Sequence, residues 1–322
     1  IYGPFDKDGG TQENGFRPRH KGWYRKTFSI PYDIEDKRVS IEFEGVYRDA
    51  EVWLNGIYLG KQANGYVGFT YDITGYVNPD KENVIAVRYD NTYISSRWYT
   101  GEGIYRNVWL HITNPVCIAE NGTYITAPYI DKDKAELDIR TEVVNHTGLR
   151  SLVTLKTEIY SPEGMLAGSV SSVVPLAANG TYLSRQTATI DRPARWDIES
   201  PDLYTAQSYV IVDNKVEDRY SSRFGVRTVE FDSEQGFLLN GRKVFLKGVN
   251  IHHDLGPLGS AFFEKGMRRR LAGLKEMGCN AIRLAHNPHA KAVLDLCDEM
   301  GILVFADCFD KWDTPAWNHY GP

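Results

Sequence analysis

The hydrophobic pattern of this chain changes its period once, near Phe231. Before that point, apolar and polar residues alternate in short segments that end in turn signals, as in β-strands with one buried face. After it, apolar residues recur at helical spacing between short apolar segments. The chain must therefore combine a β-rich region with an α/β region.

Residues 1–114 are predicted to form a β-sandwich of jelly-roll type. Asn55-Gly56 between two apolar runs is a strong signal for a tight hairpin. Closely spaced strands without a helical segment between them favour a jelly roll. The expected strands are 22–30, 38–44, 50–54, 57–59, 69–73, 83–89 and 107–112.

Residues 115–228 keep the alternating pattern but have longer strands, such as 135–144 and 151–160. Turn signals lie at 145–148, 161–164 and 179–180. About seven strands in such a length are typical of an immunoglobulin-like sandwich. We therefore predict a second β-sandwich with this architecture.

Residues 229–322 change to a strand–helix–strand–helix–strand series. The expected strands are 243–249, 280–285 and 302–306. A first helix ends at Gly278, and a second begins at Pro288 and ends at Gly301. The apolar stripes are Met267, Leu271, Leu274 and Met277 in the first helix, and Val293, Leu294, Cys297 and Met300 in the second.

Such a series predicts a parallel sheet. A closed (β/α)₈ barrel takes about 250 residues, so if this region belongs to a TIM barrel, it holds only the first three strands. The third strand, 302–306, has no charge and no proline. We expect it to present an unpaired edge, because three strands cannot close a barrel.

The composition argues against two classes of partner. Lys and Arg number 37 against 42 Asp and Glu, which gives a net charge of −5. Proteins that bind nucleic acid usually carry a basic surplus, so we expect no nucleic-acid partner. Mean hydropathy is −0.40, and there is no apolar run of about 18 residues, so we expect no membrane span.

Polar side chains follow each strand of the predicted parallel sheet, where α/β folds bind their ligands. A structural reading stays open, because strand ends are often polar where the chain leaves the core. The histidine spacing is not that of a zinc protease, and no GxSxG motif is present. The candidates are Asn250, His252, His253, Asp254, Arg283, His286, Asn287, His289, Asp307, Asp310, Trp312 and Asp313.

Six segments together resemble glycoside hydrolase family 2, the family of β-galactosidases, β-glucuronidases and β-mannosidases. They run in the order that this family shows, and the β-galactosidase branch fits best, mainly through residues 96–106. The segments are Gly22–Phe28, Ala50–Gly56, Ser96–Trp109, Phe224–Arg227, Leu239–His253 and Asn280–Pro288.

The resemblance implies a jelly-roll sugar-binding domain (1–114), an immunoglobulin-like domain (115–228) and the start of a TIM-barrel catalytic domain (229–322). It also implies a retaining glycosidase with an acid/base glutamate and a nucleophile glutamate. The acid/base normally lies in an Asn-Glu dipeptide, which this chain lacks. Both glutamates are therefore expected beyond Pro322, and the 322-residue chain alone is predicted to be inactive.

The resemblance also implies roles for individual residues. Asp90, His252, His286 and Asn287 match positions that contact the sugar. Arg283 matches an arginine that pairs with the nucleophile and keeps it ionised. The family often has Asp-Glu-Ala after the third strand, whereas this chain has Asp307-Cys308, which weakens a role for Asp307.

Several expectations concern the parent protein. The substrate is a carbohydrate, most simply a β-galactoside, with β-glucuronidase, β-mannosidase or a non-catalytic carbohydrate-binding protein as the alternatives. No cofactor or metal is indicated here, although the parent could hold a divalent or sodium ion, and it could be a homo-oligomer. Degradative enzymes of this branch commonly carry a secretion signal, which favours a periplasmic or extracellular location.

Overall fold

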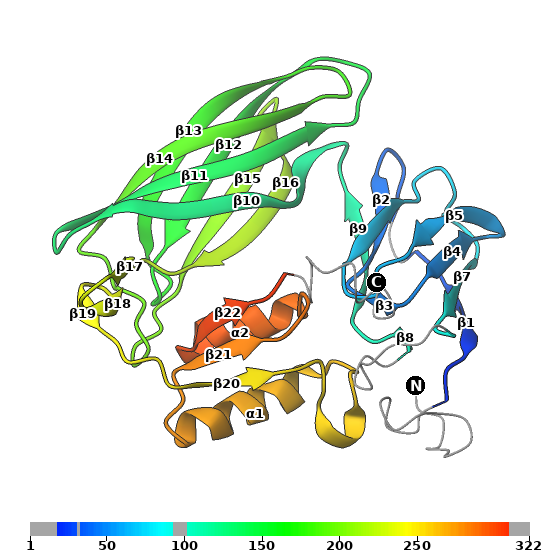
Figure 1. Cartoon of the computed structure of the whole chain (residues 1–322). Coiled ribbons are helices and arrows are strands. Elements are labelled where there is room, and N and C mark those ends of the chain that lie inside the picture. The colour runs from blue at the N-terminus through cyan, green and yellow to red at the C-terminus, as the bar shows by residue number, and fades with distance from the viewer. Residues whose placement is uncertain (1–17, 31–32, 93–101, 309–322) are drawn as a thin grey trace. The chain divides into compact units, whose positions relative to one another are not determined.

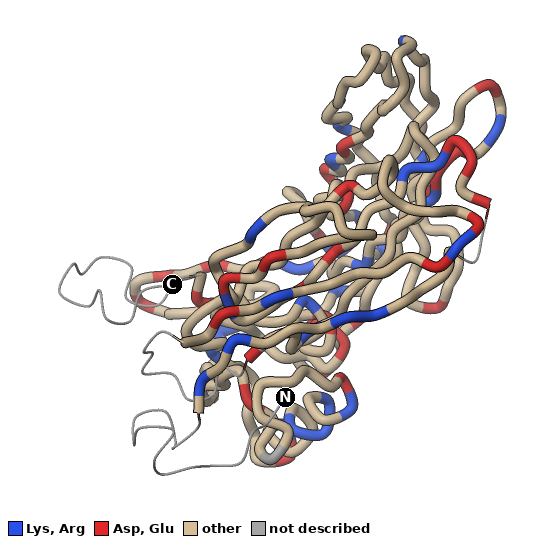
Figure 2. Tube along the Cα trace, turned by 90° about the vertical axis from the view of Figure 1, so that its right-hand side faces the viewer, with Lys and Arg blue, Asp and Glu red and all other residues tan. Residues whose placement is uncertain are grey.

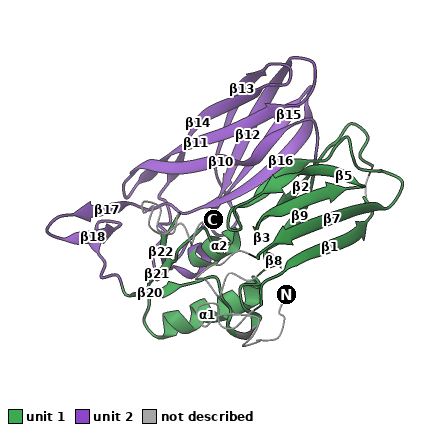
Figure 3. Ribbon diagram, turned by 45° about the vertical axis from the view of Figure 1, so that its right-hand side comes forward, with its two compact units in different colours: residues 1–112, 247–297, 304–322 green, residues 113–246, 298–303 purple. Residues whose placement is uncertain are grey.

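The computed structural model describes residues 18–30, 33–92 and 102–308 (Figure 1). Asp310, Trp312, Asp313 and residues 96–101 of the family-like segment lie outside this part. The chain divides into two compact units (Figure 3). Unit 1 comprises residues 1–112, 247–297 and 304–322, and unit 2 comprises 113–246 and 298–303. Unit 1 thus combines the first sandwich with most of the α/β region.

The first part of unit 1 is the predicted β-sandwich. One sheet has the order β1-β7-β4-β5 and another the order β6-β2-β9, while β3 pairs with β8. The strands are β1 (Lys21–Phe28), β2 (Arg38–Phe43), β3 (Val46–Tyr47), β4 (Ala50–Leu54), β5 (Ile57–Gln62), β6 (Phe69–Asp72), β7 (Asn83–Asp90), β8 (Gly103–Ile104) and β9 (Val108–Thr113).

The core of this sandwich consists of the inward residues of both sheets, among them Phe43, Leu54 and Val87. Polar residues alternate with them, as the burial pattern of β2 shows. The β4–β5 hairpin turns at Asn55 and Gly56, which have φ values of 51° and 85°. Positive φ at both central residues gives the type I′ turn that the sequence predicted.

Unit 2 contains the second sandwich, with seven strands in two sheets, β10-β11-β14 and β13-β12-β15-β16. The strands are β10 (Val116–Ile130), β11 (Lys134–Asn145), β12 (Ser151–Tyr160), β13 (Leu166–Leu176), β14 (Thr181–Asp191), β15 (Tyr204–Val212) and β16 (Lys215–Phe224). A small sheet follows, formed by β17 (Val229–Asp232), β18 (Gly236–Leu239) and β19 (Arg242–Lys243).

The α/β region forms a three-stranded sheet in the order β20-β21-β22, and β20 and β21 pair in parallel. Its elements are β20 (Gly248–Ile251), a 3₁₀ turn (Gly256–Leu258), α1 (Glu264–Glu276), β21 (Ala281–Leu284), α2 (Lys291–Met300) and β22 (Leu303–Ala306).

The end of α1 confirms the predicted stop. Gly278 has a φ of 88°, and its N–H donates to the carbonyl of Lys275 while that of Cys279 donates to Leu274. These two bonds form a Schellman motif, which favours glycine at the left-handed position.

Three local predictions for this region were wrong. The first strand covers Gly248–Ile251 rather than 243–249, because Lys243 belongs to β19 and pairs with β18. The second helix begins at Lys291, three residues after Pro288. The apolar stripes also differ, because Leu294 is 40% exposed whereas Leu296 is buried, and Met277 at the end of the first helix is 77% exposed.

The third strand occupies the predicted position at the end of the sheet. Within the described residues, β22 neighbours β21 and no further strand. Its first residue, Leu303, is buried, but Phe305 is 51% exposed. Among the residues that the structure describes, the sheet is therefore open at this edge.

The described residues include no helix that is long and apolar enough to cross a membrane. Lys and Arg are interspersed with Asp and Glu along the trace in Figure 2, in keeping with the nearly balanced composition.

Candidate functional site

The ends of β21 and β22 bring a cation and a carboxylate together. Arg283 lies in β21, and Asp307 follows β22 directly. Nε of Arg283 donates to Oδ1 of Asp307 over 3.3 Å, and Nη2 donates to Oδ2. The N–H of Asp307 also donates to the carbonyl of Leu284, which fixes the position of the carboxylate. The result is a bidentate arginine–carboxylate pair, the geometry that the planar guanidinium favours.

Two histidines complete this group at the strand ends. Nδ1 of His286 lies 3.7 Å from Oδ2 of Asp307. The ring of His252, which follows β20, lies 5.2 Å from that of His286 between centroids. The side chains of Arg283, His286 and Asp307 are 42%, 30% and 22% exposed, so a ligand can reach them. We call these four residues the strand-end group.

Three of the residues predicted from the sequence therefore lie together, namely His252, His286 and Arg283. Asp307 joins them, although its departure from the family pattern argued against a role. Arg283 was expected to pair with a nucleophile glutamate, and among the described residues it pairs with Asp307. The sequence held one signal for this pair, because the carboxyl ends of neighbouring parallel strands meet at one edge.

Asp90 lies at the end of β7 and contacts residues of the jelly roll. Its carboxylate accepts hydrogen bonds from the hydroxyl of Thr92 and pairs with Lys21 Nζ at 2.9 Å. Burial acts to raise the pKa of Asp90, but the hydrogen bonds from Thr92 and Lys21 outweigh it and lower the pKa to about 2. The carboxylate is therefore ionised, and its role toward a sugar stays a prediction.

A second pair of histidines follows the same two strands, β20 and β21. The rings of His253 and His289 stack with centroids 3.9 Å apart. Burial lowers the pKa of His253 well below its usual value, and a backbone hydrogen bond of Asn287 opposes this. Burial also lowers the pKa of His289 to about 4. Both imidazoles are therefore neutral at pH 7, and the side-chain role predicted for Asn287 stays a prediction.

Arg106 joins the jelly roll to this second pair. Its Nη1 donates to the carbonyls of Glu44 and Tyr66 over 3.1 Å and 3.0 Å. Its Nη2 donates to the carbonyl of Pro288 and lies 3.5 Å from Nδ1 of His253. Arg106 is 8% exposed, so its charge is stabilised by these acceptors rather than by water.

Arg106 was not among the site residues predicted from the sequence, although it lies in the family-like segment 96–109. Its contacts link β8 and its flanking loops to the chain that follows β21. A second link in unit 1 is the bond from the N–H of Phe262 to the carbonyl of Tyr105. Arg106 therefore fixes the loop that carries His286, without itself belonging to the strand-end group.

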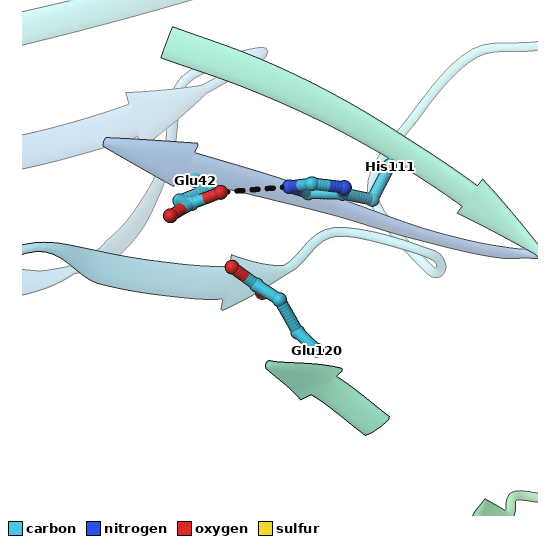
Figure 4. A group of neighbouring side chains, drawn as sticks. All are labelled: Glu42, His111 and Glu120. Atoms are coloured by element: carbon cyan, nitrogen blue, oxygen red, sulfur yellow. Dashed lines mark hydrogen bonds and ion pairs between the residues drawn. The ribbon is translucent and has the colours of Figure 1, made fainter. Parts of the chain in front are cut away.

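The jelly roll has a further histidine–carboxylate pair on its neighbouring strands β2 and β9. Nε2 of His111 and Oε2 of Glu42 lie 2.9 Å apart (Figure 4). A cross-strand pair of this kind ties two strands of one sheet together. It lies outside the strand-end group.

Three family models match consecutive parts of the chain. Residues 13–115 match the sugar binding domain of glycosyl hydrolases family 2. Residues 118–227 match the model named glycosyl hydrolases family 2. Residues 229–312 match the TIM barrel domain of the same family.

Curated relatives and solved structures agree with these models. A β-galactosidase of Bacteroides ovatus is 42% identical over 96% of the chain and 37% of its own length. A putative β-glucuronidase of Formosa agariphila is 39% identical over 96% of the chain and 29% of its own length. A family 2 crystal structure from Bacteroides cellulosilyticus superposes with a TM-score of 0.89, at 37% identity, over 92% of this chain and 38% of its own.

The chain thus spans less than half the length of these relatives. Its two sandwiches and its open parallel sheet follow one another in the order of the three matched models. The chain belongs to glycosyl hydrolase family 2 and contains the sugar-binding domain, the immunoglobulin-like domain and the beginning of the TIM barrel.

Proposed function

We propose that the chain is the N-terminal portion of a retaining exo-β-glycosidase whose preferred substrates are β-galactosides. The observation that carries this proposal is the strand-end group, Arg283, Asp307, His252 and His286, at the ligand-binding edge of a family 2 barrel segment. Imidazoles and a guanidinium can hydrogen-bond sugar hydroxyls and hold a carboxylate in its ionised form.

The reaction itself needs more than this group. A retaining glycosidase places two carboxyl groups about 5–5.5 Å apart, one as acid/base and one as nucleophile. In the strand-end group there is one carboxylate, Asp307, and Arg283 holds it. Since the relatives are more than twice as long, we propose that later barrel strands of the parent protein supply the catalytic pair. Arg283 would then either release Asp307 and bind the nucleophile carboxylate, or bind both carboxylates.

The similarity to a β-galactosidase at 42% identity favours galactosides. The similarity to a putative β-glucuronidase at 39% makes β-glucuronides the second candidate. The two differ in chemistry, because a glucuronide carries a carboxylate at C6 that requires a cationic or hydrogen-bonding partner.

The test compares the protein encoded by the whole gene with the 322-residue chain. Aryl β-galactoside and aryl β-glucuronide are offered to each preparation, purified from a host that lacks both activities. We expect the whole protein to hydrolyse the galactoside faster and the 322-residue chain to release no aryl alcohol above the buffer rate. Hydrolysis by the chain, or a whole protein inactive on both substrates, would contradict the proposal.

A matched pair of variants of the whole protein tests the strand-end group. Arg283→Ala removes the guanidinium at the strand ends, and we expect kcat/KM to fall at least about 100-fold, the scale of losing one preorganised donor at an active site. Arg269→Ala removes an arginine from the exposed part of α1 and should leave kcat/KM unchanged. Equal kcat/KM values of the two variants would show that the strand-end group does not contribute to catalysis.

A further inference from the structure

The loop that follows β20 borders a small polar pocket in unit 1. The pocket is lined by this loop, by Tyr105 and Arg106 of the jelly roll, and by residues of α1 and α2. The space inside it that a water-sized sphere can occupy is about 20 Å³. One water molecule needs at least about 10–15 Å³, so the pocket has room for one water and for no larger ligand.

Two polar atoms of the loop are buried without a hydrogen-bond partner among the described residues. They are Nε2 of His253 and Oγ of Ser260. Each of these residues is 7% exposed, and both line the pocket. A buried polar group without a partner destabilises the fold, because it loses its hydrogen bonds to water and gains none in return. An occupant that bonds to both atoms therefore stabilises the loop.

The charges around the pocket favour a neutral occupant. Arg106 is buried, and both of its Nη atoms already donate, Nη1 to two carbonyl oxygens and Nη2 to that of Pro288. The carboxylate of Asp254 lies 3.2 Å from Nη2 of Arg270. Burial lowers the pKa of His253, so its ring is neutral. A cation would lie beside the guanidinium, and an anion would find the Nη donors engaged, so either charge would be buried at a cost.

The two buried atoms also need an occupant that both donates and accepts hydrogen bonds. Nδ1 of His253 lies 3.5 Å from Nη2 of Arg106, which can only donate. When Nδ1 accepts, Nε2 carries the ring proton and needs an acceptor. In the other tautomer Nε2 has the lone pair and needs a donor. Water serves both tautomers, and the hydroxyl of Ser260 can bond to it in either direction.

We propose that this pocket binds one ordered water molecule, which bridges Nε2 of His253 and Oγ of Ser260. Buried waters characteristically bond to polar groups that the protein itself leaves unpaired. The loop is already tied at its tip, where the N–H of Leu255 donates to the carbonyl of Gly259 over 2.6 Å. The water adds a second tie, between positions 253 and 260, and so closes the loop at its base.

The water bridge also restrains the strand-end group. His252 directly precedes His253, so a tie on His253 limits the movement of the backbone that carries the His252 ring. That ring lies 5.2 Å from the ring of His286. Ser260 is therefore a positioning residue, which acts on His252 through the water and His253. This role is independent of the proposed function, because it needs no substrate.

A high-resolution crystal structure of the 322-residue chain shows whether the pocket is occupied. We expect one water peak within about 3.2 Å of both Nε2 of His253 and Oγ of Ser260. Crystals soaked in bromide or in a zinc salt distinguish water from an ion, because bromide and zinc scatter anomalously. A bromide or zinc peak at this position, or a pocket without electron density, would overturn the proposal.

A matched pair of serine variants tests the bridge in solution. Ser260→Ala removes the hydroxyl, so the number of long-lived waters counted by magnetic relaxation dispersion should fall by one. The NMR signals of the His252 ring should shift as well. Ser233→Ala removes an exposed hydroxyl between β17 and β18 and should change neither. The same number of long-lived waters in both variants, or unchanged His252 signals in Ser260→Ala, would contradict the bridge.

Discussion

The strands of the two sandwiches and those of the three-stranded parallel sheet differ in which of their residues are buried. Every second residue of β11 is buried along its twelve residues, so one face packs in a core and the other meets solvent. Parallel strands are normally buried on both faces. In β20, however, Gly248, Val249 and Asn250 are exposed, and in β22 the last two residues are exposed.

This difference separates the regions that close their own hydrophobic cores from the one that does not. Each sandwich closes its own core with strands that the chain itself supplies. The parallel sheet shows one well-packed central strand, β21, between two strands with exposed residues. A barrel sheet needs neighbours on both sides, so this region depends on further strands in a way that the sandwiches do not.

The largest expected effect is the loss of a core ring from a sandwich. Phe43 is 1% exposed and stacks on Phe69 at 5.0 Å. Phe43→Ala should lower the free energy of unfolding by about 3–5 kcal/mol, since it removes buried area and leaves a cavity. Denaturant unfolding followed by circular dichroism measures the change.

The comparison is sharpened by the same substitution on the open edge. Phe305 in β22 is 51% exposed, so Phe305→Ala should cost less than about 1 kcal/mol. If both variants lost equal stability, then β22 would be as well packed as the jelly-roll core, and the contrast between the two regions would fail.

The next effect is a pH dependence that arises in the α/β region. The pKa of His289 is lowered by burial from 6.5 to about 4, so the folded state resists its protonation. Between these values the unfolded chain binds more protons, and the free energy of unfolding falls as the pH falls from 6.5 to 4. The loss from this residue is roughly 3 kcal/mol, at about 1.4 kcal/mol for each pKa unit.

A matched pair of histidine variants isolates this contribution. His289→Gln cannot titrate, so its stability should depend less on pH in this window than that of the wild type. His146→Gln changes an exposed histidine of unit 2 and should leave the wild-type pH dependence intact. A wild-type slope in the His289→Gln variant would show that this imidazole is not held in its neutral form.

The smallest effect concerns the arginine that joins the two parts of unit 1. Arg106→Ala leaves the carbonyls of Glu44, Tyr66 and Pro288 without their donor, and a buried group left unsatisfied costs about 1–3 kcal/mol. The exposed pair of Arg38 and Asp72 is the control, because Arg38→Ala should cost less than about 1 kcal/mol. Equal losses in urea unfolding would mean that Arg106 is no more important than a surface ion pair.

The features predicted well from the sequence are those that local chemistry decides. Alternation located the jelly-roll strands, Asn55-Gly56 located a hairpin, and Gly278 marked the end of α1. In each case the residue type itself prefers the conformation that the structure shows.

The features that were missed depend on residues far apart in the sequence. The start of β20 is set by its neighbours, because the N–H of Lys247 donates to Oδ1 of Asn280 and Lys243 pairs elsewhere. The helix after Pro288 begins late, at a point where the carbonyl of Pro288 accepts a bond from Arg106. No local pattern distinguishes such an arginine from an exposed one.

The positions of the candidate site residues divide in the same way between local and long-range causes. The polar strand ends identified His252, Arg283 and His286, because topology brings such ends to one edge. The partnership of Arg283 with Asp307 needed coordinates, since any carboxylate at that edge could have filled the place.

Hydrogen exchange of backbone amides tests the contrast between closed sandwiches and an open sheet most directly. The measurement compares β22 (303–306) with β2 (38–43) in a dilute monomeric solution of the 322-residue chain. Since β22 has one neighbouring strand among the described residues, we expect amides of residues 303–306 to exchange well before those of 38–43. Equal protection of the two strands would contradict it, because some other element would then cover the edge of the sheet.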